Sequence, residues 1–446
     1  MRHFLLVKRL IGPAIILSAL LMALSCSPSA VAQSAAPQTQ SFRLAGMKFS
    51  GLKRFSEEQA AKATGLRIGD AVTQAQLAAV VDKLAKSGAF ENVAFRYSTN
   101  AGSLNVEFEV TEVSKLLPCL FDNFVWFSEA QLDSSLRTRV SFYAGGVPES
   151  GTTAEDVRIA LRDLIRAAGI PGDVTAIPSI AGLGQPVSAF VYSVTGVAMP
   201  IRSIRFSGAA AIPAGRLEAA SSQIIGRDYS ASFVSEFAGA GLVPLYRKQG
   251  YLRARFEKPE GKPLHADPAA GPVQEISVAL AVDEGPEFYW ERAEWTGNRV
   301  FTSEELDRLL GMKPKEVANQ EKIDSGLAAI KRAYDTRGFI EAAVKPREIL
   351  NDNARLTTYN VAVEEGAQFH LGAVHFEGLP ELASKELAKN WKLKPGDVFD
   401  ATYANTFVSQ VAMGKLKELG IQKTSATVNP KPEKQNASVD LKIVFH

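Results

Sequence analysis

Short segments in which hydrophobic and polar residues alternate recur along the chain and predict strands with one buried face. In Leu104–Val110, Ile276–Val282 and Val439–Phe445, every second residue is strongly hydrophobic. Between such segments lie stretches with hydrophobic residues three or four positions apart, as in Leu77–Leu84, and these predict helices that pack by one face. The chain therefore belongs to the α+β class, with helices and strands in regular succession.

A glycine follows the second predicted helix of each succession and is followed in turn by a hydrophobic residue. Glycine adopts the left-handed backbone conformation without a steric penalty, so it ends a helix and lets the chain leave as a strand. These glycines lie 81 to 88 residues apart, and a period of this kind indicates tandem repeats. They are Gly88, Gly169, Gly250, Gly338 and Gly420.

A second group of glycines follows the first predicted strand of the repeats and marks a turn before a polar helix start. These turn glycines are Gly51, Gly208, Gly297 and Gly378, and the second repeat has Asn123 at this position. Each repeat is thus expected to run strand, helix, helix, strand, strand (βααββ). Short linkers between neighbours predict a stiff, elongated rod. The expected limits are 1–32 for a signal peptide and 42–112, 113–197 (divergent), 198–284, 285–365 and 366–446 for five repeats.

The N-terminus has the charge and length pattern of a signal peptide. Arg2, Lys8 and Arg9 precede a largely hydrophobic run, 10–24, and we expect cleavage after Ala32. Two alternatives stay open. Cys26 lies in a loose lipoprotein box and is a candidate for lipidation, and an uncleaved anchor would need a run nearer to about 20 residues.

The repeats resemble POTRA domains, the βααββ modules of the outer-membrane assembly factor (BamA-like) family. The resemblance is clearest in Glu284-Gly285-Pro286-Glu287-Phe288 with Trp295-Thr296-Gly297-Asn298, and in Glu365-Gly366 with Phe376-Glu377-Gly378. It implies a periplasmic array associated with the outer membrane. Large members of the family continue into a membrane β-barrel, whereas we expect none in this chain, because the fifth repeat extends to Phe445-His446.

The resemblance also implies polypeptide binding at an open sheet edge, where an extended client adds a strand. By resemblance the edge strands follow the capping glycines, at 90–97, 251–256, 339–344 and 421–428. The third repeat is the main candidate, with Tyr251, Leu252, Ala254 and Phe256 interleaved with Arg253 and Arg255. The two arginines are open to a second interpretation, since charged residues keep edge strands soluble.

Composition and motifs exclude several other functions. Lys and Arg number 50 against 48 Asp and Glu, which does not provide the basic excess of a nucleic-acid-binding protein. Two cysteines and five scattered histidines form no disulfide framework or metal motif. Motifs of hydrolases and nucleotide-binding enzymes are missing, so we expect no catalytic residues, no metal and no cofactor.

The sequence therefore predicts a periplasmic protein that binds unfolded outer-membrane or secreted proteins and assists their assembly. A separate β-barrel assembly protein is a further expected partner, and that partner or a lipid anchor would provide membrane association. Two alternatives remain: a membrane-anchored envelope scaffold of the FtsQ type, or the periplasmic part of a split or truncated barrel assembly factor.

Overall fold

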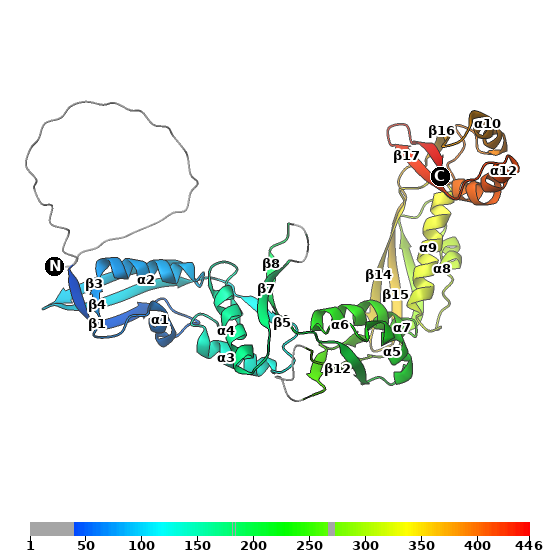
Figure 1. Cartoon of the computed structure of the whole chain (residues 1–446). Helices are drawn as coiled ribbons and strands as arrows, with labels where there is room; N and C mark the ends of the chain where they lie inside the picture. The colour runs from blue at the N-terminus through cyan, green and yellow to red at the C-terminus, as the bar shows by residue number, and fades with distance from the viewer. Residues whose placement is uncertain (1–39, 181, 183, 266–272) are drawn as a thin grey trace, which may run out of the picture. The chain divides into compact units, whose positions relative to one another are not determined.

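The computed structural model of the protein describes residues 40–446 except 181, 183 and 266–272 (Figure 1). The predicted signal peptide, with Cys26 and the cleavage site after Ala32, lies outside the described residues. The chain forms two compact units. One comprises the described residues up to Ile204 with Ile224–Phe233 and Glu260–Val278, and the other comprises Arg205–Gln223, Val234–Pro259 and Ala279–His446.

The first repeat shows the order of elements that the others follow. A strand is followed by two helices and a β-hairpin, with one further short strand between the helices. Both helices begin with a capping box, in which Ser56 and Thr73 accept hydrogen bonds from the main chain of Gln59 and Gln76. The elements are β1 (Ser41–Ser50), α1 (Glu57–Thr64), β2 (Ala71–Thr73), α2 (Gln74–Lys86), β3 (Phe90–Asn100) and β4 (Ser103–Glu112).

The other four repeats keep this order with local differences. The second contains β5 (Leu117–Phe121), α3 (Glu129–Arg139), β6 (Gly146–Val147), α4 (Thr153–Ala167), β7 (Asp173–Ile180) and β8 (Val187–Thr195). The third contains β9 (Ile201–Ser207), α5 (Ala214–Ser221), η1 (Ser222–Ile224), α6 (Ala231–Phe237), η2 (Ala238–Leu242), α7 (Val243–Arg247), β10 (Arg255–Phe256), β11 (Glu260–Pro263) and β12 (Ile276–Asp283). The fourth contains β13 (Tyr289–Thr296), α8 (Ser303–Leu310), α9 (Gln320–Thr336), β14 (Ala343–Asn351) and β15 (Leu356–Glu364). The fifth contains β16 (His370–Glu377), α10 (Glu381–Asn390), α11 (Tyr403–Phe407), η3 (Val408–Ala412), α12 (Met413–Glu418), β17 (Ala426–Glu433) and β18 (Ser438–Phe445).

The last strand of each repeat lies in the middle of its sheet. In the first repeat, β4 pairs in parallel with β1, with Phe49 opposite Phe108, and antiparallel with β3, where Phe95 is opposite the same residue. Parallel strands need a long crossover connection, and the helices form part of it. The third main strand therefore lies at an edge of the sheet, and these edge strands are β3, β7, β14 and β17 in the first, second, fourth and fifth repeats.

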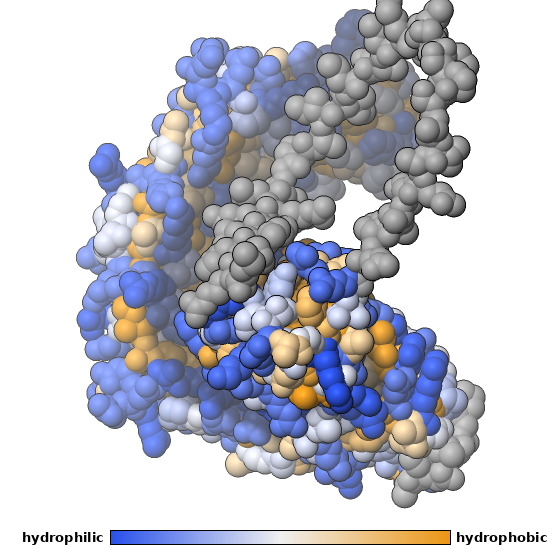
Figure 2. All heavy atoms as spheres, turned by 90° about the vertical axis from the view of Figure 1, so that its left-hand side faces the viewer, coloured by the Kyte–Doolittle hydropathy of each residue, from blue (hydrophilic) through white to orange (hydrophobic). Residues whose placement is uncertain are grey.

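The helices of a repeat bury their hydrophobic face against one side of the sheet. In the first repeat Leu84 of α2 and Phe108 of β4 belong to one core, and in the fifth Leu387 of α10 and Leu441 of β18 do the same. Burial of one such side chain contributes about 2 kcal/mol. On the face that Figure 2 shows, hydrophilic residues dominate and hydrophobic residues appear in small groups between them.

The nine glycines that the sequence singles out all have positive φ angles. Gly297, directly after β13, shows why no other residue fits. Its φ is +81°, and a Cβ atom there would lie 2.2 Å from the main-chain oxygen of Val363 in β15. The turn after the first strand therefore rests directly on the central strand of the sheet. The same main-chain approach occurs at Gly51, Gly208 and Gly378.

The α+β architecture of sheet–helix repeats agrees with the sequence pattern, and the described residues form five sheets. The count of five POTRA-like repeats and their exact limits stay predictions. None of the described helices combines the length and the hydrophobicity that crossing a membrane requires.

Candidate functional site

The predicted edge strand of the third repeat, 251–256, is mostly not a strand. Only its last two residues form β10, where they pair with Val282 and Asp283. The residues before them turn back on the capping glycine, since the main-chain N–H of Leu252 donates to the oxygen of Gly250 and that of Ala254 to the oxygen of Tyr251. A strand prediction for Tyr251, Leu252, Arg253 and Ala254 is therefore wrong, because a tight turn uses their hydrogen-bonding groups.

The side chains of this turn join the third repeat to the fourth. Leu252 is buried with Phe288 and Ala318. The guanidinium of Arg253 donates two hydrogen bonds to the carboxylate of Asp352, at 2.6 and 2.8 Å. These residues all lie within one compact unit. Alternation of apolar and basic residues, which suggested a client-binding edge, here reflects a turn with a buried side and an ion-paired side.

A capping glycine connects its repeat to the next one by the same main-chain hydrogen bond in two places, and we call this connection a joint. The main-chain N–H of Phe288 donates to the oxygen of Gly250, and that of Phe369 donates to the oxygen of Gly338, both at 2.8 Å. A Cβ atom at Gly338 would lie 2.6 Å from the main-chain oxygen of Phe369. Sequence reasoning missed these joints, although the spacing Glu-Gly-x-x-Phe recurs at 284–288 and 365–369 and could have indicated them.

Edge strands are present in the other repeats, with shifted starts. The predicted window 90–97 lies within β3. The windows 339–344 and 421–428 overlap only the beginnings of β14 and β17, which start at Ala343 and Ala426. In the fourth repeat the intervening residues form a turn, since the N–H of Ala342 donates to the oxygen of Phe339. These strands are the candidate sites for strand addition.

The opposite edge of each sheet, along its first strand, is partly closed. In the first repeat β2 pairs with the start of β1. The loop between the helices hydrogen-bonds to the first strand in later repeats as well, at Trp290 in the fourth and at Leu371 in the fifth. The first strands also carry irregularities of register, which blunt an edge. The edge formed by the third strand is consequently the more accessible one.

The surface of β3 combines apolar and ion-paired side chains. Phe95 and Tyr97 stack on each other and are partly buried against the core. On the other face Arg96 bridges Glu107 and Glu109 of β4. The hydrogen bond from Arg96 holds the pKa of the Glu107 carboxyl below its usual value. The edge thus offers apolar contact on the helix side and a cluster of ion-paired side chains on the open side.

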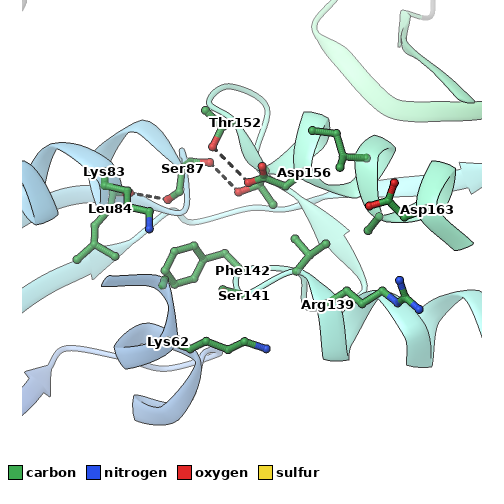
Figure 3. A pocket seen from close by; sticks show the side chains of 15 residues that line it. Lys62, Lys83, Leu84, Ser87, Arg139, Ser141, Phe142, Thr152, Asp156 and Asp163 are labelled. Carbon is green, nitrogen blue, oxygen red and sulfur yellow. Dashed lines mark hydrogen bonds between the residues drawn. The ribbon is translucent and has the colours of Figure 1, made fainter. Parts of the chain in front are cut away.

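A pocket of about 430 Å³ lies between the first and second repeats, within one compact unit (Figure 3). Thr153 at the start of α4 donates a hydrogen bond to the main-chain oxygen of Ser87 at 2.8 Å. Burial raises the pKa of the Asp156 carboxyl. The lining contains both positive and negative side chains, so it favours neither an anion nor a cation as ligand. We interpret the pocket as part of the packing between the first and second repeats. Its charged lining residues are Lys62, Lys83, Arg139, Asp156 and Asp163.

Cys119 in β5 is unsuited to nucleophilic chemistry, because burial raises the pKa of its thiol to about 12. The thiolate is the reactive form, so the side chain stays protonated near neutral pH. In a Cys26→Ser protein we expect iodoacetamide to leave Cys119 unmodified in the native state and to label it after unfolding in urea, as measured by mass spectrometry. Complete labelling of the native protein would contradict this.

Within the residues that the structure describes, His, Cys, Asp and Glu do not gather in groups of three or more that could hold a metal. The acidic pairs at 57–58 and 304–305 lie in the first turns of α1 and α8, where carboxylates stabilise a helix. Glu365, at a repeat junction, instead accepts main-chain hydrogen bonds from Arg299 and Val300. This carboxylate therefore holds a loop in place.

Comparison with known proteins identifies the kind of repeat. The POTRA family, described as a surface antigen variable number repeat, matches residues 288–366. A protein named as an outer membrane protein assembly factor of Treponema pallidum (strain Nichols) is 23% identical over 161 residues. The outer membrane protein assembly factor BamA of Neisseria meningitidis serogroup B is 21% identical over 176 residues. The matches cover 36% and 37% of this chain but only 19% and 22% of the relatives' length.

Among solved structures, Haemophilus influenzae BamA POTRA3-5 is 18% identical, with a TM-score of 0.41 and coverage of 55% of this chain and 96% of that one. POTRA1-3 of Omp85 from Anabaena is 17% identical, with a TM-score of 0.23 and coverage of 56% and 94%. Residues 288–366 thus match the POTRA family, and about a third of the chain is similar to outer-membrane assembly factors.

Proposed function

We propose that this protein binds unfolded outer-membrane or secreted polypeptides in the periplasm and assists their assembly, without catalysing a reaction. Strand addition at an open sheet edge is the mode of binding. The observation that carries the proposal is the accessible third-strand edge, seen in its most regular form at β3 (Phe90–Asn100). Main-chain groups at such an edge hydrogen-bond to any extended chain, which suits a protein with many clients.

Two further observations support the proposal. The sequence relatives are named as outer membrane protein assembly factors. The positively charged and hydrophobic N-terminal segment predicts export from the cytoplasm. Together they favour a periplasmic location beside the outer membrane, with a separate assembly protein as a second partner.

A crosslinked pull-down of the processed protein from its own envelope fraction tests this function. We expect mass spectrometry to recover outer-membrane proteins and their assembly factors, together with an N-terminus at Gln33. Main-chain recognition at the edges predicts several unrelated clients in place of a single stoichiometric partner.

The rival scaffold function makes a different prediction for the same experiment. It requires recovery of division or wall-synthesis proteins and an intact N-terminal segment. That outcome would replace the assembly function. A protein lipidated at Cys26 would instead have its N-terminus there, which would change the mode of membrane association and leave the function as proposed.

A further inference from the structure

Prolines lie within the edge strands of three repeats. Pro178 lies in β7 opposite Phe190, and Pro346 lies in β14 opposite Val361. In β17, Pro430 and Pro432 lie opposite Leu441 and Val439. Proline has no N–H, so a strand tolerates it where the missing donor faces away from the neighbouring strand. At these positions an incoming strand would find no donor and would meet the ring of the proline.

The third repeat has a broken edge. Its two edge strands are short, and residues 257–259 separate them. The main-chain N–H of Gly261 in β11 already donates to the hydroxyl of Tyr229 at 3.0 Å. This edge therefore offers no continuous row of free main-chain groups.

The edge of β3 has neither defect. It contains no proline, and it pairs with β4 in unbroken register from Asn92 to Asn100. The partly buried rings of Phe95 and Tyr97 lie on the side that faces the helices. A strand added beside them would place every second side chain against these rings.

We propose that extended polypeptide segments pair with β3, and that the prolines of β7, β14 and β17 keep those edges from pairing. The inference rests on the proposed function and adds where binding occurs and what is bound. The preferred ligand is an unfolded segment about as long as the regular part of β3, with apolar residues at alternate positions.

The repeats provide a matched position for the test. In the first repeat, Thr99 of β3 pairs with Leu104 of β4. Leu104 lies six residues before Val110, whose main-chain oxygen lies against Gly51. Pro432 pairs with Val439, which lies six residues before Phe445, the residue that Gly378 contacts. The two positions are therefore equivalent in register. Because the fifth sheet accommodates proline there and Thr99 is exposed, Thr99→Pro should close the edge of β3 and leave its sheet folded.

The experiment uses the full chain with a photocrosslinking benzoylphenylalanine at Ser98 or at Lys431, which occupy the same register in β3 and β17. The probe is a urea-unfolded outer-membrane porin, diluted from denaturant. We expect crosslinking at Ser98 to exceed that at Lys431 about tenfold, and Thr99→Pro to lower it about tenfold. Thr99→Val keeps the N–H and should have no such effect. Pro430→Val with Pro432→Thr should raise crosslinking at Lys431.

Equal crosslinking at the two positions, or equal yields in Thr99→Pro and Thr99→Val, would overturn the inference. Retention of the porin on immobilised protein separates this failure from failure of the proposed function. If the porin is retained but does not crosslink at Ser98, only the choice of β3 fails. If it is not retained at all, both proposals fail. Hydrogen exchange of the β4 amides reports whether the first sheet stays folded in each variant.

Discussion

Alanine in place of Gly297 is expected to destabilise the fourth repeat by about 3 kcal/mol or more, because two costs add. The residue has a φ of +81°, which side chains other than glycine rarely adopt. The new Cβ atom would also lie 2.2 Å from the main-chain oxygen of Val363, in the central strand of the sheet. The contact joins the turn directly after β13 to the main chain of β15, so the clash cannot relax by rotation of a side chain.

Gly311 in the same repeat provides the control. Its φ is +75°, but no atom lies within 4 Å of the position that a Cβ would occupy. Gly311→Ala should therefore cost only the backbone strain, about 1 kcal/mol. Native-state hydrogen exchange of the amides in β15 measures both variants within the full chain, without assuming a two-state transition. Equal loss of protection in the two variants would show that the contact with Val363 does not matter.

Removal of the Glu365 side chain is expected to cost the fourth repeat about 2 to 3 kcal/mol, because three hydrogen-bond donors lose their acceptor. The carboxylate accepts from the main-chain N–H groups of Arg299 and Val300 at 2.7 and 2.8 Å, and from the hydroxyl of Tyr334 at 3.0 Å. Tyr334 is fully buried in the folded protein, and Glu365 is the acceptor of its hydroxyl.

The neighbouring Glu364 is the matched control for Glu365→Ala. It forms an exposed ion pair with Lys345, and such pairs contribute less than about 1 kcal/mol. Glu364→Ala should therefore change hydrogen exchange of β15 little. A cost for Glu364→Ala similar to that of Glu365→Ala would contradict the structural role assigned to the junction carboxylate.

Acid should remove the contribution of Glu365 selectively. Burial raises the pKa of this carboxyl, but the hydrogen bonds from Val300, Arg299 and Tyr334 outweigh burial and hold the pKa below its ordinary value. Because the pKa is lower in the folded than in the unfolded state, the ionised carboxylate stabilises the folded protein at pH values above the unfolded pKa of about 4.3. This stabilisation is lost as the pH falls through the folded pKa. The difference in stability between wild type and Glu365→Ala should shrink over that range.

The sequence pattern predicts the helix-ending glycines, the turn glycines and the buried core positions well, because all of them depend on local chemistry. Val439, Leu441, Ile443 and Phe445 alternate in the sequence and are all buried in the fifth repeat. Sheet order could not be predicted in this way. The pairing of Phe49 with Phe108 joins residues far apart in the chain, and periodicity contains no information about which strands become neighbours.

The error in the third repeat has a local cause. Leu252, Ala254 and Phe256 have the spacing of a strand with one buried face, and two of them, Leu252 and Ala254, are indeed buried. A turn places alternate residues inside as well, so burial at every second position does not distinguish the two structures over so short a stretch. The hydrogen bond from the main-chain N–H of Leu252 to the oxygen of Gly250 shows that the chain forms a turn here.

The joints at Gly250 and Gly338 have a consequence for how such a chain can change in evolution. Their central hydrogen bonds run from the main chain of Phe288 and Phe369 to the main chain of the glycines. Side-chain identity therefore contributes little to this bond, apart from the missing Cβ of the glycine. A duplicated gene segment that begins and ends at such glycines would form the same bond with any neighbour that keeps the spacing, so repeats can be gained or lost without compensating substitutions at the hydrogen bond itself.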